Sequence, residues 1–147
     1  MITTILNFAG IIFIGLFIYE ISNAIKSILV KNWPLTDGKL HKWNIKAEDQ
    51  GEDTARVIDE LVYKYEVKGK GYESNQIGYG FPMSMSVLYV DKTLNNIFET
   101  ATNLTVYYNP KKPDVSVLTV GLKIYHVVKM LGYLLIIIVF YVFANNS

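Results

Sequence analysis

Few residues of this chain combine a reactive side chain with favourable spacing, and those that do border two apolar segments. Glu20 ends an uncharged run that begins at Met1, while Lys129 precedes another that continues to Ser147, with His126 one helical turn earlier. If both runs are membrane helices, we expect Glu20 to face the second helix and to approach Lys129 or His126, directly or through water. Ionisable groups inside a helix bundle pair with one another and can carry ions or protons. The alternative is that both helices protrude from the membrane and these groups are hydrated.

No motif in the sequence points to an enzymatic activity. His41 and His126 are the only histidines and are far apart, and the absence of cysteine excludes disulfides and thiolate sites. No nucleophile elbow, phosphate-binding loop, paired-histidine metal motif or nucleotide fingerprint is present. The formal charge of +1, from 14 basic and 13 acidic side chains, offers no clustered basic surplus for nucleic acid. We therefore predict no catalytic residue, no metal site, no cofactor and no nucleic-acid partner.

The two uncharged runs predict membrane helices. About twenty apolar residues cross roughly 30 Å of hydrocarbon. The second run reaches this length when Lys123, His126 and Lys129 lie at the interface, where lysine can extend toward water. We assign residues 1–30 to the first helix with its domain-side extension, and residues 121–147 to the second. A cleaved signal peptide competes for the first run, but no basic residue precedes it.

The positions of the lysines predict the orientation. Lys26 and Lys31 follow the first run, Lys123 and Lys129 open the second, and neither outer tail carries a basic side chain. Under the positive-inside bias the central domain is cytoplasmic and both termini lie across the membrane. We expect a two-pass protein of a bacterial inner or cell membrane, in contact with membrane lipids.

A strand-like alternation dominates the central domain, residues 31–120. It is clearest over 55–72, where apolar side chains recur at every second position and charged ones face the other way. Lys68–Gly71 supplies turn chemistry, which predicts a hairpin. A weaker strand is predicted over Thr36–Asp49, and an exposed acidic loop over Ala47–Thr54.

The end of the central domain changes period twice. Apolar residues at helical spacing over 90–101, with Asp91 available as an N-cap, predict one short helix. Strands over 103–108 and 115–120 follow. One helix among several short strands favours a membrane-anchored α+β fold, in which two transmembrane helices flank a small antiparallel β-sandwich or half-open barrel.

The connection between the last two strands, NPKKPD, is the most distinctive motif of the chain. Asn109 favours turn initiation, and Pro110 and Pro113 fix backbone angles, so we interpret the motif as a structural turn. Lys111 and Lys112 have an ordinary place in such a turn. The alternative is contact with anionic lipid head groups, for which two lysines fall short of the usual polybasic cluster.

Three segments carry a resemblance to a known family: WPLTDGKL at 33–40, YKYEVKGKGY at 63–72 and VYYNPKKPDVSVLTVG at 106–121. Together with the flanking apolar runs they resemble the family of small membrane proteins described as a domain of unknown function, number 3592. The resemblance implies a β-rich domain inserted between two membrane helices, and it implies no general activity. One departure is visible, because Ala101–Asn103 stands where a glycine is usually expected.

Three classes of function fit this architecture. The first is a non-enzymatic protein-interaction module with one protein partner, whose specialised form is an immunity or inhibitor protein against a membrane-acting toxin; size and architecture are its basis. The second is a transport or channel accessory subunit. It requires a homo-oligomer, because two helices cannot enclose a pathway. An enzyme acting on lipid or envelope substrates ranks last.

Overall fold

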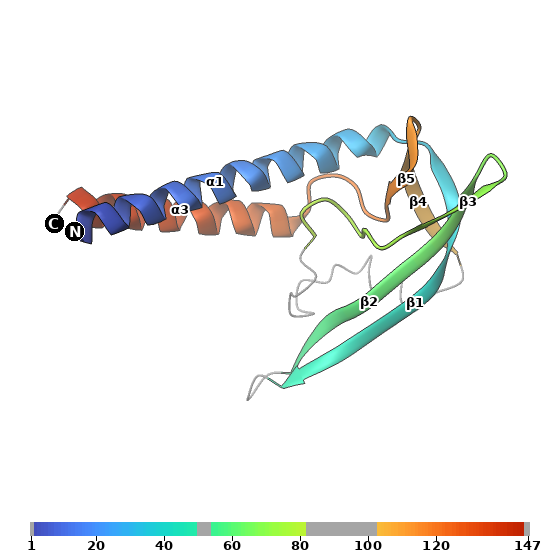
Figure 1. The fold of residues 1–147 in the computed structure, drawn as a ribbon, viewed down its shortest axis with the longest axis horizontal. Helices are drawn as coiled ribbons and strands as arrows, with labels where there is room; N and C mark the ends of the chain where they lie inside the picture. Colours follow the sequence, from blue (N-terminus) through green and yellow to red (C-terminus); the bar gives the residue numbers. More distant parts are fainter. Residues whose placement is uncertain (1, 50–53, 82–102, 146–147) are drawn as a thin grey trace.

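The computed structural model describes residues 2–49, 54–81 and 103–145. Two long helices lie side by side and antiparallel, with a β-domain at one end of the pair and both chain termini at the other (Figure 1). Helix α1 spans Ile2–Leu29 and helix α3 spans Ile124–Asn145. A short 3-10 turn, η1, covers Val30–Asn32 and leads from α1 into the first strand.

Both helices are long and apolar enough to cross a membrane. Most of their large apolar side chains outside the contact between the two helices stay exposed, as expected for helices that face lipid. The two helices also contact each other, since the rings of Phe13 and Phe140 stack with centroids 5.6 Å apart. A Cβ atom on Gly10 would lie 3.9 Å from the Cβ of Phe140, so this small residue marks a place of close approach.

Five strands form one antiparallel sheet in the order β3-β2-β1-β4-β5. The sheet curls so that its outer strands, β3 and β5, approach each other, which gives a nearly closed barrel. The predicted fold class is therefore confirmed, and of its two alternatives the barrel describes the sheet. The strands are β1 (Leu35–Asp49), β2 (Thr54–Val67), β3 (Lys70–Ser74), β4 (Leu104–Asn109) and β5 (Lys112–Val117).

Strands β1 and β2 form a hairpin much longer than the rest of the sheet (Figure 1). Their pairing continues through Ala47↔Arg56 to Asp49↔Thr54, so the acidic loop expected over Ala47–Thr54 was predicted too wide. Backbone pairing tolerates charged side chains, because the ladder needs only the N–H and C=O groups. The short helix predicted over 90–101 lies outside the described residues.

A register shift between Leu40 and Lys42 makes His41 the extra residue of a β-bulge. Before the shift Leu40 pairs with Tyr63, and after it Trp43 pairs with Leu61, so the bulge keeps these four side chains on one face. Leu40 packs against the core on that face.

The core of the β-domain lies inside the curl of the sheet. Two tyrosines of β2 reach across it: the Tyr63 hydroxyl lies 3.0 Å from Ser116 Oγ and donates to the Gln76 carbonyl at 2.9 Å, and the Tyr65 hydroxyl donates to the Pro113 carbonyl. The contacts with Ser116 and Pro113 join β2 to β5, which are not neighbours in the sheet. The buried members of the core are Leu61, Tyr63, Tyr65, Val67, Ile77, Leu104, Val106 and Leu118.

Two turns follow their sequence signals. Between β2 and β3, Lys68 and Gly69 both adopt left-handed angles, φ 53° and 78°, as a two-residue type I′ hairpin requires, so the predicted hairpin is confirmed. Between β4 and β5, the Asn109 side-chain oxygen accepts from the backbone N–H groups of Lys111, at 2.9 Å, and Lys112, at 3.3 Å. This side chain mimics a backbone turn, as predicted for Asn109. The turn is shorter than the predicted NPKKPD segment, because β5 begins at Lys112 and Pro113 lies within that strand.

Candidate functional site

Three segments meet where the β-domain joins the helix pair: α1, α3 and the connection 75–81 that follows β3. Ile77 fixes the connection, because its carbonyl accepts from the backbone N–H groups of Leu118 and Thr119, at 3.0 and 2.8 Å, and from the Thr119 hydroxyl at 3.1 Å. The next residue, Gly78, lies so close to Thr119 that a side chain there would collide with it. Residues 78–81 are thereby carried onto the helices.

Aromatic contacts hold this connection against both helices. The Phe81 ring meets the Tyr125 ring of α3 edge to face, with centroids 5.6 Å apart. Lys26 of α1 places its ammonium group 5.9 Å from the centre of the Tyr79 ring. The connection therefore bridges the two helices.

At this junction Glu20, His126 and Lys129 are in direct contact. Glu20 Oε1 lies 2.7 Å from His126 Nδ1, and Glu20 Oε2 lies 3.5 Å from Lys129 Nζ. The Lys129 ammonium also donates to the Gly80 carbonyl at 2.6 Å. The structure thus brings together the three residues singled out in the sequence, without an intervening water between Glu20 and His126.

The trio is buried to different extents. Glu20 is 2% exposed and His126 0%, whereas 22% of the Lys129 side chain is exposed. A carboxylate withdrawn from water to this degree is tolerated only when it is paired and hydrogen-bonded. Glu20 has both an imidazole and an ammonium partner, so these contacts compensate for the burial of its carboxylate. Lys129 lies at the edge of the site and keeps access to solvent.

Gly80 is a part of the site that sequence reasoning missed. Its backbone adopts φ +65°, which favours glycine, and a Cβ atom there would lie 3.0 Å from both Glu20 Oε1 and His126 Cε1. The carbonyl that accepts from Lys129 can reach the helices only because no side chain intervenes. The glycines of the GYG triplet at 78–80 were the available signal, but they look like ordinary turn residues.

Asn23 and Ser27 were also missed, although a signal existed. They follow Glu20 by three and seven residues, which places all three polar side chains on one face of α1, and both are buried. Within the described part of the chain, Asn23 Nδ2 and His126 Nε2 have no hydrogen-bond partner. The site therefore holds a carboxylate, an imidazole, an ammonium group and an amide, and the last-named group and the imidazole each keep one nitrogen that could form a further hydrogen bond.

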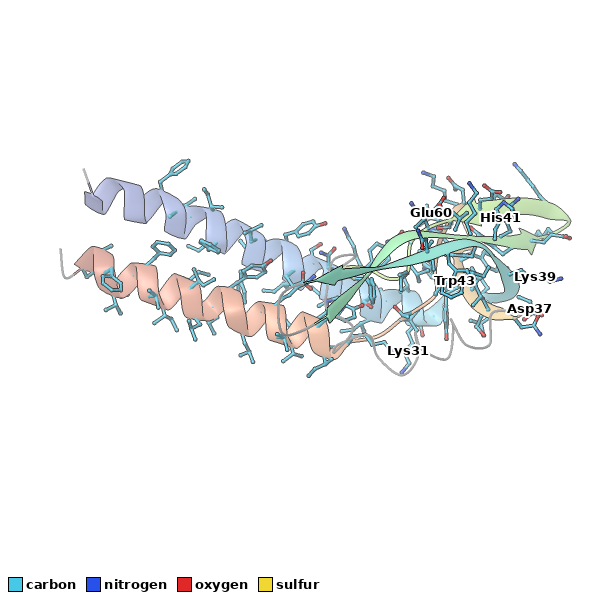
Figure 2. The ribbon with its side chains drawn as sticks, turned by 90° about the horizontal axis from the view of Figure 1, so that it is seen from below. Lys31, Asp37, Lys39, His41, Trp43 and Glu60 are labelled. Carbon is cyan, nitrogen blue, oxygen red and sulfur yellow. The ribbon has the colours of Figure 1, made fainter. Side chains whose placement is uncertain are left out.

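These groups can bind and exchange a proton, and their opposite charges can hold α1 and α3 together at the junction. They lack the geometry of a nucleophile activated by a base. Among the side chains that the structure describes, no cluster of three or more His, Asp or Glu residues is placed to bind a metal. The second histidine, His41, lies on the β-domain away from the helix pair (Figure 2), so the two imidazoles cannot act together.

A second feature is an open cleft of about 570 Å³ on the outer face of the sheet. Its charged side chains come from β1, β2 and β3 and carry both signs. Lys64 and Glu73 pair across it at 2.9 Å, and this ammonium group holds the pKa of the exposed Glu73 carboxyl below its ordinary value. The lining residues are Asp37, Gly38, Lys39, Lys64, Tyr65, Glu66, Gly71, Tyr72, Glu73 and Asn103.

The turn lysines do not line this cleft: Lys111 lies between β4 and β5, and Lys112 begins β5. Lys112 is within 3.8 Å of Asp114, and both side chains are well exposed. An exposed pair of this kind contributes little to stability, and the aspartate offsets part of the positive charge that a lipid head group would meet. Contact of Lys111 and Lys112 with lipid stays a prediction.

Comparison with known proteins gives one informative match. The family model described as "Domain of unknown function (DUF3592)" matches residues 36–123, which cover the β-domain and reach the start of α3. Searches of curated proteins and of solved structures find no match. Since the match spans more than half of the 147 residues, the chain belongs to the DUF3592 family.

Proposed function

We propose that this protein is a two-pass membrane protein whose β-domain is a non-enzymatic interaction module, and that the β1–β2 ribbon is its binding element. The supporting observation is the uneven length of the strands. β4 pairs with β1 only over Leu35–Gly38, and β3 pairs with β2 only over Tyr63–Val67. From Lys42 to Val62 the two long strands pair with each other and with no other described strand.

Such a ribbon leaves backbone N–H and C=O groups open along both edges, in the described part of the chain. Open edges recruit a further strand, and many recognition domains bind an extended peptide in this way. A two-stranded ribbon is also marginally stable in water, so a partner that pairs with it or covers a face stabilises it. Trp43, which is 48% exposed, lies on this ribbon (Figure 2). Tryptophan is enriched among residues that dominate binding energy.

The specialised form that we propose is an immunity or inhibitor protein for a membrane-acting toxin. Its support is architectural: an anchored domain whose ribbon is presented beside a helix pair can meet a partner at the membrane surface or in the bilayer. The lysines at the domain-side helix ends support a cytoplasmic β-domain. Reporter fusions at both termini test the orientation, and cytoplasmic reporter activity at either terminus would contradict it.

Site-specific photo-crosslinking in native membranes tests the interaction. A photoreactive amino acid at Trp43 should give one discrete adduct with a partner, and the same group at Lys111, in the exposed β4–β5 turn, is the matched control. The adduct should disappear when a proline replaces Asn44 on the ribbon, because proline removes a backbone donor and disturbs strand pairing. Equal or absent adducts at Trp43 and Lys111 would remove the ribbon as the binding element.

A second candidate, a transport or channel accessory subunit, has one observation in its favour. Glu20, His126 and Lys129 form a charged group between two helices that are apolar enough to cross a membrane. Buried ionisable groups in such helices often mark ion or proton pathways. Flux in reconstituted vesicles that Glu20→Gln abolishes would favour this function, whereas a monomer without flux would exclude it.

A further inference from the structure

The Glu20 site has a charge balance that depends on His126. Among the described residues, the groups around the imidazole are Glu20 and the Asn23 side chain from α1, Lys129 and the Tyr125 ring from α3, and the Gly80 backbone from the connection. The next cation, Lys26, lies over the ring of Tyr79. One carboxylate and one ammonium group therefore compensate each other when the imidazole is neutral.

The contact with Glu20 also determines which nitrogen of the imidazole carries the proton. An ionised carboxylate only accepts hydrogen bonds, so His126 Nδ1 must donate across the 2.7 Å contact. The other nitrogen, Nε2, then carries a lone pair. It is buried and has no partner among the described residues. A proton added to Nε2 would create a buried N–H group without an acceptor and a second positive charge beside one carboxylate.

We propose that protonation of His126 is a switch that releases the connection 77–81 from the helix pair. Two cations then compete for Glu20. His126 is fully buried and directly bonded to Glu20, whereas part of the Lys129 side chain already reaches solvent. Lys129 is the group that can leave, and its departure breaks the 2.6 Å bond to the Gly80 carbonyl.

The release changes how the β-domain is held. Residues 77–81 continue from β3, so their attachment to α1 and α3 links the barrel to the helices in addition to the covalent links at both helix ends. When this attachment opens, the barrel loses one of the contacts that hold it to the helix pair. The mechanism depends only on the contacts of His126, Glu20, Lys129 and Gly80, and not on which partner the ribbon binds.

Hydrogen exchange of the full chain in lipid nanodiscs tests the switch. After correction for the intrinsic pH dependence of exchange, amides of 77–81 should exchange about tenfold faster near pH 5 than near pH 7.5, since one hydrogen bond to a charged group is lost. Amides of β3, the neighbouring strand, should not change. In His126→Gln the side-chain amide can still donate to Glu20 but cannot gain a charge, so 77–81 should stay protected at both pH values.

Histidine NMR provides a second test, in a chain whose Glu20 site is left unaltered. The chain has two histidines, and His41 is exposed on the sheet, so His41→Gln leaves a single imidazole signal. Nitrogen shifts should show the neutral tautomer with the proton on Nδ1 near pH 7.5, and gain of a proton over the range in which 77–81 opens. A charged imidazole at pH 7.5, or acid opening that is the same in His126→Gln, would overturn the proposal.

Discussion

Ser27 on α1 and Gly121, just before α3, exchange two hydrogen bonds. The Ser27 hydroxyl donates to the Gly121 carbonyl at 2.8 Å, and the Gly121 N–H donates to the Ser27 carbonyl at 2.7 Å. Gly121 adopts φ +84°, a left-handed conformation that turns the chain from β5 toward the second helix. The entry of α3 is therefore fixed against the last turns of α1, and this contact sets the spacing of the two helices next to the Glu20 site.

Ser27→Ala should lower the free energy of unfolding by about 1 kcal/mol, because the half-buried Gly121 carbonyl loses its side-chain donor. Thermal unfolding in detergent micelles measures the change. Ser22→Ala, a half-buried serine on the same helix, is the matched control and should have little effect. A loss of stability that is equal in the two variants would mean that helix packing, not the contact with Gly121, accounts for it.

Gly80→Ala should be more destabilising than Gly69→Ala. Both glycines have positive φ, so both variants pay a backbone cost of about 1 kcal/mol. An added Cβ meets nothing within 4 Å at Gly69, but at Gly80 it lies 3.0 Å from Glu20 and His126. Overpacking should add about 1–3 kcal/mol at Gly80. Denaturation of both variants under one condition tests the difference, and equal effects would contradict the close packing at the site.

The sequence predicted the helix pair and the Glu20 contact because both follow from one-dimensional patterns. Charges that end two uncharged runs must lie at similar depth once the runs form antiparallel helices, and the turn residues at Lys68–Gly69 and Asn109–Pro110 act within their own neighbourhood. These features need no knowledge of the rest of the fold.

Gly80 could not be identified in the same way. Its place beside Glu20 depends on the curl of the sheet and on the anchoring of Ile77 to Thr119, which are contacts between segments distant in sequence. The acidic end of the ribbon was predicted in two conflicting ways. The strand expected over Thr36–Asp49 ends where β1 ends, but the acidic loop expected over Ala47–Thr54 overlaps it, and only the pairing with β2 shows that the strand prediction holds.

Alkaline pH should destabilise the barrel through Tyr63. Burial raises the pKa of Tyr63 from 10.0 to about 12, so the folded state binds this proton more tightly than the unfolded state. The resulting stability is complete below pH 10 and is lost as the pH rises through 12, and the pKa difference corresponds to roughly 3 kcal/mol.

Tyr63→Phe separates this effect from general alkaline unfolding. The variant loses the bonds to Ser116 and Gln76, so it should be less stable at neutral pH by about 1–2 kcal/mol. Its stability should then fall less than that of the wild type between pH 10 and 12. Denaturant titrations across this range measure both changes, with Tyr141→Phe, exposed on α3, as the control. Parallel losses in wild type and Tyr63→Phe would show that another group is responsible.

The pairing of Glu20 with Lys129 predicts strongly non-additive mutations. Glu20→Gln removes the only carboxylate within 4 Å of the Lys129 ammonium group among the described residues, and loss of one partner from a buried ion pair typically costs about 3–5 kcal/mol. Because Lys129 keeps access to solvent, the cost here should lie at or below the lower end. Lys129→Met removes the cation and leaves Glu20 with His126 alone, which can neutralise the carboxylate only by becoming charged itself.

The double variant Glu20→Gln/Lys129→Met removes both charges and should be more stable than the two separate losses predict, with a coupling of about 1 kcal/mol or more in a double-mutant cycle. Unfolding in detergent micelles near pH 7.5 measures all four proteins. Additive losses would show that the two charges do not interact, and the 3.5 Å contact would then have no energetic role.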